Sequence, residues 1–296
     1  MMKTYVLAAA FLAAAAAPAS AYTSYLKPEQ FWVTESEVQV EGSYATQFFT
    51  PAIALGSGLT VLNPTGEPVS ADRVAVTAGG ATELDADLSR GGTYRVSTGE
   101  VAGAVGTLVA ENGQWRGLAA GEAAPAGAET TTIQVISVAD TYVTRGAASR
   151  TVVDQPIGRL AIHPITHPNQ VLANQGFEIE LLFDGAPLAN SAVVLYAAGD
   201  PETKLDRYVA TDANGRATFT FDAPGQYILA ARHRAELPPG SPAQHGSYTT
   251  TLTFEALSQL YAETQIADEQ PAEQAQDERP RRERTPARRR VGRPDY

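Results

Sequence analysis

Cysteine is absent from the 296-residue sequence, and methionine and tryptophan occur only twice each. Without cysteine the chain can form no disulfide, and no thiolate can act as a nucleophile or as a ligand for a soft metal. Basic residues are also in deficit, since 22 Lys and Arg stand against 33 Asp and Glu. The net charge of −11 argues against nucleic-acid binding, because phosphate contacts require a basic surface.

Long apolar runs are missing except at the N-terminus. Met1-Met2-Lys3 leads into an apolar run over residues 5–17, which ends at Pro18 and the small residues Ala19-Ser20-Ala21. A charged start, a short apolar run and an A-x-A ending are typical of a secretory signal peptide. We predict a signal peptide over residues 1–21, cleaved after Ala21, and a periplasmic or secreted protein. No later stretch approaches the roughly 20 apolar residues of a spanning helix, so we expect no transmembrane segment in the mature chain.

The rest of the chain alternates β-branched and aromatic residues with polar ones, between turns rich in Gly, Asn, Asp and Pro. Asn112-Gly113 predicts a tight hairpin turn, and Asn214-Gly215 marks another turn. No convincing amphipathic helix is present. The pattern predicts strands over residues 37–44, 73–77, 93–97, 107–111, 114–118, 131–138, 159–162, 176–183, 192–197, 207–211, 217–221, 226–232 and 248–255.

Evenly spaced short strands favour an all-β fold of two immunoglobulin-like β-sandwich domains. We predict an N-terminal domain over residues 22–152 and a C-terminal domain over 153–264. Each half has a glycine turn that leads into a strand with an inward-facing tyrosine, Tyr94 in residues 91–96 and Tyr227 in residues 224–229. This internal echo indicates that the two sandwiches are related.

The last part of the chain, residues 265–296, is predicted to be a disordered charged tail. It is rich in Pro, Gln, Glu and Arg and has basic clusters at Arg281-Arg282, Arg284 and residues 288–290. Such a composition buries too little apolar surface to order itself. One interpretation is a solvated extension, and the other is electrostatic docking to an anionic lipid, a cell-wall polymer or an acidic partner.

Several strand and turn segments carry a family resemblance: residues 25–28, 182–188, 211–219, 224–227 with 231–233, and 248–255. Together they resemble the bacterial domain of unknown function 4198 family, which is similar to the periplasmic component of nickel and cobalt uptake transporters. The resemblance implies a binding or accessory role in transition-metal uptake, with nickel or cobalt as ligand and a membrane transporter as partner. Family members often begin the mature chain with a histidine. Here that position holds Tyr22, whose phenol cannot chelate a metal with its own amine as imidazole does.

The remaining candidate metal ligands are the four histidines His163, His167, His233 and His245. A proline follows each of the first two, so a helix that aligns them is not expected, and on a strand they lie about 13 Å apart. His233 and His245 can converge across a hairpin. The alternative for each is a surface histidine without a ligand.

No catalytic motif is present, and we predict that the protein is not an enzyme. Residues 85–91 imitate the opening of a calcium loop, but Val96 occupies the position of the EF-hand glutamate, so we interpret them as a turn between strands. A hydrolase would need carboxylates from distant loops to meet in a cleft.

Two binding hypotheses therefore remain besides the hydrolase. The first is the transition-metal accessory protein, in which at least three donors meet at one point. The second is an interaction module that presents loops or edge strands to an outer-membrane receptor, a polysaccharide or a cell-wall partner, through an exposed apolar or aromatic patch. Trp115, beside the hairpin turn, is either a surface contact or a core residue. Tyr22, Tyr25, Phe31 and Trp32 form either a contact surface or the packing of an ordered N-terminal strand.

Overall fold

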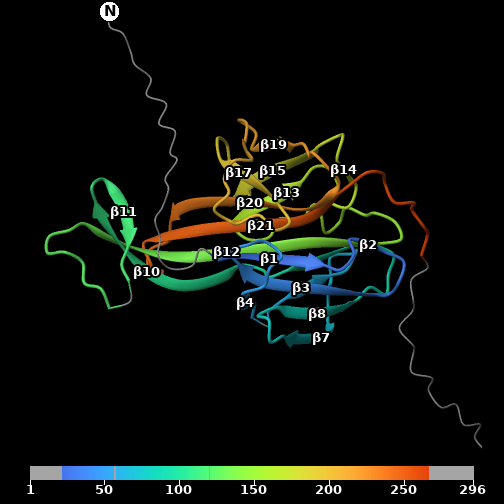
Figure 1. The fold of residues 1–296 in the computed structure, drawn as a ribbon, viewed down its shortest axis with the longest axis horizontal. Helices are drawn as coiled ribbons and strands as arrows, with labels where there is room; N and C mark the ends of the chain where they lie inside the picture. Colours follow the sequence, from blue (N-terminus) through green and yellow to red (C-terminus); the bar gives the residue numbers. More distant parts are fainter. Residues whose placement is uncertain (1–21, 57, 120, 267–296) are drawn as a thin grey trace, which may run out of the picture.

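Strands from both halves of the sequence share one large central sheet, and a smaller sheet covers each of its faces (Figure 1). The structure is a computed structural model that describes residues 22–266 except 57 and 120. The central sheet has twelve strands. Its main path is β18 (Tyr208–Ala210), β17 (Ala192–Ala197), β20 (Gly225–Glu236), β21 (His245–Leu257), β12 (Thr130–Arg145), β9 (Gly92–Ser97), β5 (Thr60–Leu62) and β6 (Pro68–Val69). Four more strands join it at the sides: β2 (Trp32–Val33), β10 (Val101–Glu111), β11 (Gln114–Gly117) and β14 (Val171–Leu172).

The two outer sheets come from different halves of the chain. The upper sheet consists of β13 (Leu160–Pro164), β15 (Phe177–Phe183), β16 (Ala186–Pro187) and β19 (Arg216–Phe219). The lower sheet consists of β1 (Thr23–Pro28), β3 (Glu37–Ala45), β4 (Ile53–Ala54), β7 (Ala71–Val76) and β8 (Thr82–Asp87). The all-β class and the sandwich-like packing of sheets are thus as predicted. The predicted signal peptide and residues 267–296 of the predicted tail lie outside the described residues.

Alternate residues of β17 and β20 enter two different cores. In β17, Val193 and Leu195 face the upper sheet, whereas Val194 and Tyr196 pack against residues of β1 and β3. A strand that is buried on both faces is apolar throughout, which accounts for the unbroken apolar run of β17. The lower sheet therefore packs against strands of the N-terminal half and also against β17 and β20 of the C-terminal half.

The two halves meet where β12 runs parallel to β21, with Ile133 opposite His245 and Thr141 opposite Thr253. β12 contributes to both cores, with Tyr142 in the upper one and Val143 in the lower one. The predicted domain boundary after residue 152 stays a prediction. Val152 on one side of it and Val153 on the other are both buried in the upper core.

The two tyrosines of the internal echo make the same contact. The hydroxyl of Tyr94 donates to the carbonyl oxygen of Arg90 at 3.0 Å, and that of Tyr227 donates to the carbonyl oxygen of Ala223 at 2.8 Å. Each partner is four residues upstream, and each ring is buried. A tyrosine that bonds back to the backbone at a sheet corner is a feature of immunoglobulin-like sandwiches. One such corner lies in each half, and both tyrosines face inward as predicted.

Every predicted strand range overlaps an observed strand, and the hairpin at Asn112-Gly113 is confirmed. These two residues have φ angles of 52° and 76°, and Glu111 pairs with Gln114 across the turn. This is the left-handed backbone that a two-residue hairpin requires. Tyr25, Phe31 and Trp32 are buried, so the N-terminal strand packs into the sandwich, whereas Tyr22 is exposed.

The interpretation of residues 85–91 as a turn is wrong for its first three residues, which belong to β8. Leu84 and Ala86 are fully buried between the sheets, while Glu83 and Asp85 point outward between β3 and β7. The carboxylates thus occupy the solvent face of a regular strand. The turn begins only at Leu88.

Candidate interaction site

An arm projects from one end of the molecule, formed by residues 101–131 (Figure 1). It contains β10, the tight turn, β11 and the loop that returns to β12. β10 pairs with β12 on one side, and with β11 on the other only from Leu108 onward. The arm is thus a narrow extension of the central sheet.

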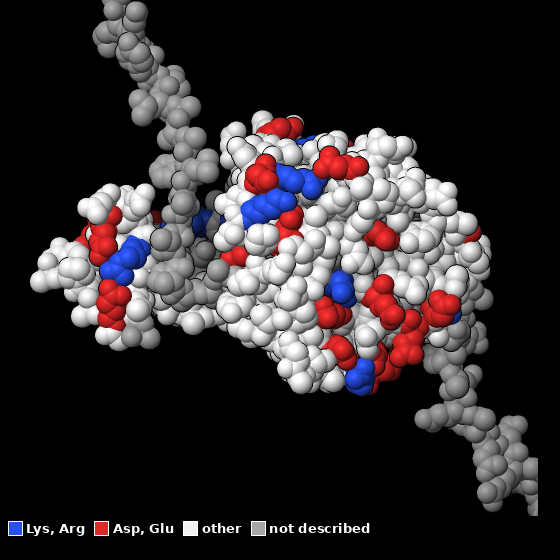
Figure 2. All heavy atoms as spheres, in the orientation of Figure 1, with Lys and Arg blue, Asp and Glu red and all other residues white. Residues whose placement is uncertain are grey.

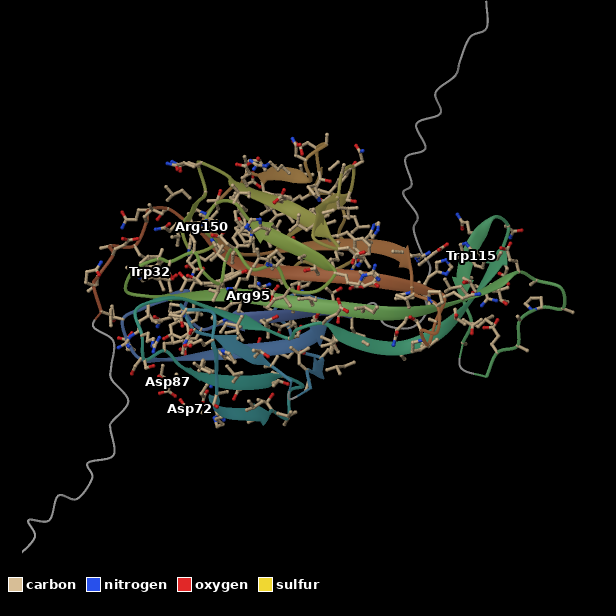
Figure 3. The ribbon with its side chains drawn as sticks, turned by 180° about the vertical axis from the view of Figure 1, so that it is seen from behind. Trp32, Asp72, Asp87, Arg95, Trp115 and Arg150 are labelled. Carbon is tan, nitrogen blue, oxygen red and sulfur yellow. The ribbon has the colours of Figure 1, made fainter. Side chains whose placement is uncertain are left out.

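Apolar side chains are exposed on and beside this arm. All residues of β10 from Val101 to Gly106 are exposed. Trp115 is 36% exposed, and Val105 and Val135 are 44% and 43% exposed. Figure 3 places Trp115 on the arm, away from Trp32 in the body. Because Trp115 is a surface residue, the alternative that it belongs to the core is excluded.

Arg116 holds the arm together. Its guanidinium lies 2.9 Å from a carboxylate oxygen of Glu111 and 2.8 Å from one of Glu122. Hydrogen bonds from Arg116 hold the pKa of both carboxyl groups below their usual range. Figure 2 shows a basic group between acidic groups on the arm. The positive charge of Arg116 is therefore compensated by carboxylates of the arm itself.

A cleft of about 720 Å³ lies between Trp115, the start of β12 and the tip of the β20–β21 hairpin. This volume is within the range of small-molecule and peptide sites. The cleft is lined by residues of the arm and the start of β12 together with a segment more than a hundred positions further along the chain. The lining residues are Trp115, residues 129–132 and residues 236–245.

Hydrogen bonds fix the floor of the cleft. The Thr131 hydroxyl donates to Oε1 of Gln244 at 2.7 Å, and the Gln244 amide donates to the Thr132 hydroxyl at 2.9 Å. Three prolines of the hairpin tip, Pro238, Pro239 and Pro242, also line the cleft. Since proline fixes φ, these three positions have little backbone freedom to lose when a ligand binds.

The charged groups that line the cleft are acidic. They are Glu129 and Glu236, and neither lysine nor arginine is among the lining residues. An exposed indole beside carboxylates is suited to cations, since the ring face attracts positive charge. The chemistry of the cleft therefore favours a basic or neutral occupant over an anionic one.

His245 and His233 lie on the β20–β21 hairpin but do not converge. His245 lines the cleft, with Nδ1 3.0 Å from the Thr131 hydroxyl. His233 packs against the ring of Phe183 at 4.5 Å between ring centroids, and burial lowers its pKa. In the pairing of β20 with β21, His245 lies opposite Glu236, which is three positions from His233. At about 3.3 Å per residue, the two histidines are about 10 Å apart along the strands.

His163 lies on β13 between two carboxylates. Its Nδ1 is 3.3 Å from Glu180, and its Nε2 is 3.4 Å from Asp154. Asp154 and Glu180 approach different nitrogens of the ring. A single metal ion on one ring nitrogen therefore could not be bound by both carboxylates in this arrangement. Asp154 is also bound by Arg150 at 2.6 Å.

His167 is buried and has a structural role. Its Nε2 lies 3.1 Å from both the Thr93 hydroxyl and the Ser149 carbonyl oxygen, and its Nδ1 accepts from the amide of Asn169. Burial lowers its pKa to about 4, so it is neutral at pH 7. Within the described part of the chain, no group of three or more His, Asp or Glu is arranged to hold a metal ion.

Comparison with known proteins identifies the family. The model of the family called domain of unknown function (DUF4198) matches residues 19–235. The chain belongs to the DUF4198 family. The match ends at the start of the cleft-lining hairpin tip, so residues 236–245 lie beyond it. No curated protein matches the chain in sequence. Of the residues that the structure describes, none belongs to a helix long and apolar enough to cross a membrane.

Some solved structures align with this DUF4198 protein over much of its length. The D0-D1 domain of intimin is 12% identical, and the alignment covers 77% of this chain and 96% of that one, with a TM-score of 0.20. A tetra-tandem repeat from the extending region of a large adhesion protein is 13% identical, with 80% and 75% covered and a TM-score of 0.21. Alpha-2-macroglobulin from Escherichia coli, over domains MG0-NIE-MG1, is 9% identical, with 74% and 94% covered and a TM-score of 0.18. Scores this low carry no argument about the fold or function of the chain.

Two residues of the cleft, Trp115 and His245, were candidates from the sequence, but the sequence did not predict that the segments lining the cleft lie together. Trp115 stands out because a tryptophan next to an Asn-Gly turn is close to a hairpin tip, and His245 stands out as one of four histidines. The proline-rich tip gave no signal that it would face the arm. That contact depends on the parallel pairing of β12 with β21.

Proposed function

We propose that this DUF4198 protein is an exported, non-enzymatic interaction module that binds a protein partner through its arm and cleft. The observation that carries the proposal is the exposure of apolar side chains on both faces of the arm region, at Trp115, Val101, Val105 and Val135, together with the cleft that Trp115 lines. Exposed aromatic and aliphatic clusters beside a pocket are typical of contact sites.

The packing of the body supports this assignment. The sandwich cores are closed by large apolar side chains, while residues Val101 to Gly106 of β10 are exposed on both faces of the strand. A projecting extension of a sheet contributes little to the core, so its apolar residues are better explained by contact with a partner. Export is supported by the N-terminal sequence, with its short apolar run and Ala19-Ser20-Ala21.

Site-specific photo-crosslinking in the producing cells tests the proposal. A benzoylphenylalanine replaces Trp115 in one variant and Tyr208 in the control. Tyr208 is 55% exposed and lies on β18, at the edge strand of the central sheet. We expect a discrete adduct from position 115 that protease removes, and none from position 208.

Two results would contradict the proposal. Equal adducts from both positions would indicate random collisions rather than a site. An adduct at 115 that resists protease but is removed by a glycosidase would assign the arm to a polysaccharide instead of a protein.

A role in nickel or cobalt uptake, with a membrane transporter as partner, stays a prediction that rests on the family resemblance. Calorimetric titration with nickel and cobalt tests it, using wild type beside a variant with His163, His233 and His245 replaced by alanine. His167 is left intact because it is buried in a structural network. Binding in wild type that the triple variant loses would support metal handling.

A further inference from the structure

We infer that the cleft beside the arm binds the arginine-rich segment 281–290 of a second copy of this chain. The inference rests on the proposed function, because it names the occupant of the same site. Copies would then associate head to tail, with the tail of one in the cleft of the next.

Charge complementarity is the first argument. Glu129 and Glu236 line the cleft, which has no lysine or arginine in its lining. Segment 281–290 carries six arginines in ten residues. Arginine presents a planar fork that binds a carboxylate through two parallel hydrogen bonds, and its plane also stacks on aromatic rings. The cleft offers both kinds of partner, carboxylates and the exposed indole of Trp115.

The place where the described chain ends is the second argument. The backbone amide of Thr264 donates to the carbonyl oxygen of Gly146 at 2.8 Å, and Ile266 packs against Gly91 and Gly146. Gly146 directly follows β12, whose first residues, from Thr130, line the cleft. The described chain therefore ends near the C-terminal end of β12, whereas the residues of β12 that line the cleft are at its N-terminal end.

β12 gives the distance between the two ends. At about 3.3 Å per residue, the 16-residue strand spans about 50 Å. The 15 residues 267–281 reach at most about 50 Å when fully extended. Arg288–Arg290 lie further along the tail and could reach their own cleft with slack, but the whole segment, including its first arginine cluster, would fit there only if residues 267–281 formed a straight chain, with a large loss of conformational entropy. A neighbouring copy has no such restriction.

The relation between cleft and tail also fixes the type of assembly. The two surfaces differ and lie at opposite ends, so the contact is heterologous rather than two-fold. Such a contact propagates into chains of copies unless the rotation between them closes a ring. Because it is mainly electrostatic at an open cleft, it should weaken as salt increases.

A labelled peptide tests the inference. Its sequence is that of residues 279–293, and the matched control peptide has every arginine replaced by glutamine. Fluorescence anisotropy measures its binding to the full exported chain in wild type, in Glu129→Gln with Glu236→Gln, and in Trp115→Ala. A second double variant, Glu37→Gln with Asp87→Asn, removes the same amount of charge from the lower sheet, where these residues pair across strands.

We expect the arginine peptide to bind wild type and the lower-sheet variant alike. Binding should be about tenfold weaker in the cleft double variant, since each exposed ion pair contributes up to about 1 kcal/mol. Sedimentation velocity of the full chain should show an average mass that rises with protein concentration. That rise should be lost in the cleft double variant and in a chain whose tail arginines are replaced by glutamine.

Three results would overturn the inference. The first is no binding of the arginine peptide, or equal weakening in both double variants, which would leave only non-specific attraction. The second is peptide binding only to the chain whose tail arginines are replaced by glutamine, together with a wild type that stays monomeric, which would place a chain's own tail in its cleft. The third is a concentration-dependent mass that persists in the cleft double variant. A protein adduct at position 115 would still support the proposed function in each case.

Discussion

The guanidinium of Arg95 lies 2.5 Å from a carboxylate oxygen of Asp140, and both side chains are almost completely buried. Arg95 also donates to the carbonyl oxygen of Gln155, in the segment that leads into the second half of the chain. One cation thus joins β9, β12 and the connection between the sandwiches.

Asp140→Asn should lower the free energy of unfolding by about 3 kcal/mol or more, because it leaves the buried Arg95 without its counter-charge. Urea denaturation followed by circular dichroism measures the change. Asp85→Asn is the matched control, since Asp85 pairs with Arg73, which is half exposed. That change should cost less than about 1 kcal/mol. Equal losses in the two variants would show that burial does not strengthen the Arg95 pair.

His167 should make the protein less stable in acid. Its pKa is about 4 in the folded chain and 6.5 in the unfolded one, so the unfolded chain takes up the proton first. The stability contributed by the neutral imidazole is complete above pH 6.5 and is lost as the pH falls toward 4, in total about 3 kcal/mol. Arg150, Asp154 and Glu263 are the charged groups that act on this ring.

Urea unfolding of wild type and His167→Gln from pH 7 to pH 4 isolates this contribution. The carboxylates titrate in both proteins, so the difference between the two curves belongs to His167. The wild type should lose its stability advantage over this window. Parallel curves would contradict the assigned pKa.

Gly146→Ala should release the segment that precedes the tail. Gly146 has a φ of +75°, and a Cβ there would lie 2.4 Å from Cγ1 of Ile266 and 2.5 Å from the carbonyl oxygen of Thr264. Hydrogen exchange at the Thr264 amide should become faster. Gly113→Ala is the control, because it has a similar φ but open space around it. It should cost only the left-handed strain of about 1 kcal/mol and leave Thr264 protected.

The two tryptophans should respond in opposite ways to replacement by alanine. Trp32 is buried and stacks on Tyr261 with ring centroids 5.5 Å apart, so its loss should cost about 3 to 5 kcal/mol. Trp115→Ala should change the free energy of unfolding by less than about 1 kcal/mol and should remove partner binding. Chemical denaturation measures the first quantity and crosslinking from a benzoylphenylalanine at Gln114 the second. A large loss of stability in Trp115→Ala would contradict a surface role.

The local pattern of residues predicted the strands better than it predicted how the strands are assembled. Period-2 alternation identifies a strand with one face in solvent, and the glycine turn of each half predicted the inward-facing rings of Tyr94 and Tyr227. β8 was overlooked because its outward residues Glu83, Asp85 and Asp87 resemble a cation-binding loop more than a strand. Its buried residues, Leu84 and Ala86, carry the alternation that could have revealed it.

The shared central sheet could not be read from such patterns. Pairing of β12 with β21 depends on contacts between residues more than a hundred positions apart, for which local periodicity has no signal. The same reason explains why the cleft was missed, since Trp115 and the proline-rich tip meet only through that pairing. The histidines were judged by their spacing, whereas their partners come from other strands, as with His163 and Glu180.

The direction of β12 has a mechanical consequence. A pull between the arm and the C-terminal end of the chain would run along the axis of this strand, and β21 pairs with it in parallel over nine positions. Force along the strands loads those hydrogen bonds together in shear, instead of opening them one after another. If the protein links two bodies through these ends, the connection that carries the tension is also the one that joins its two halves.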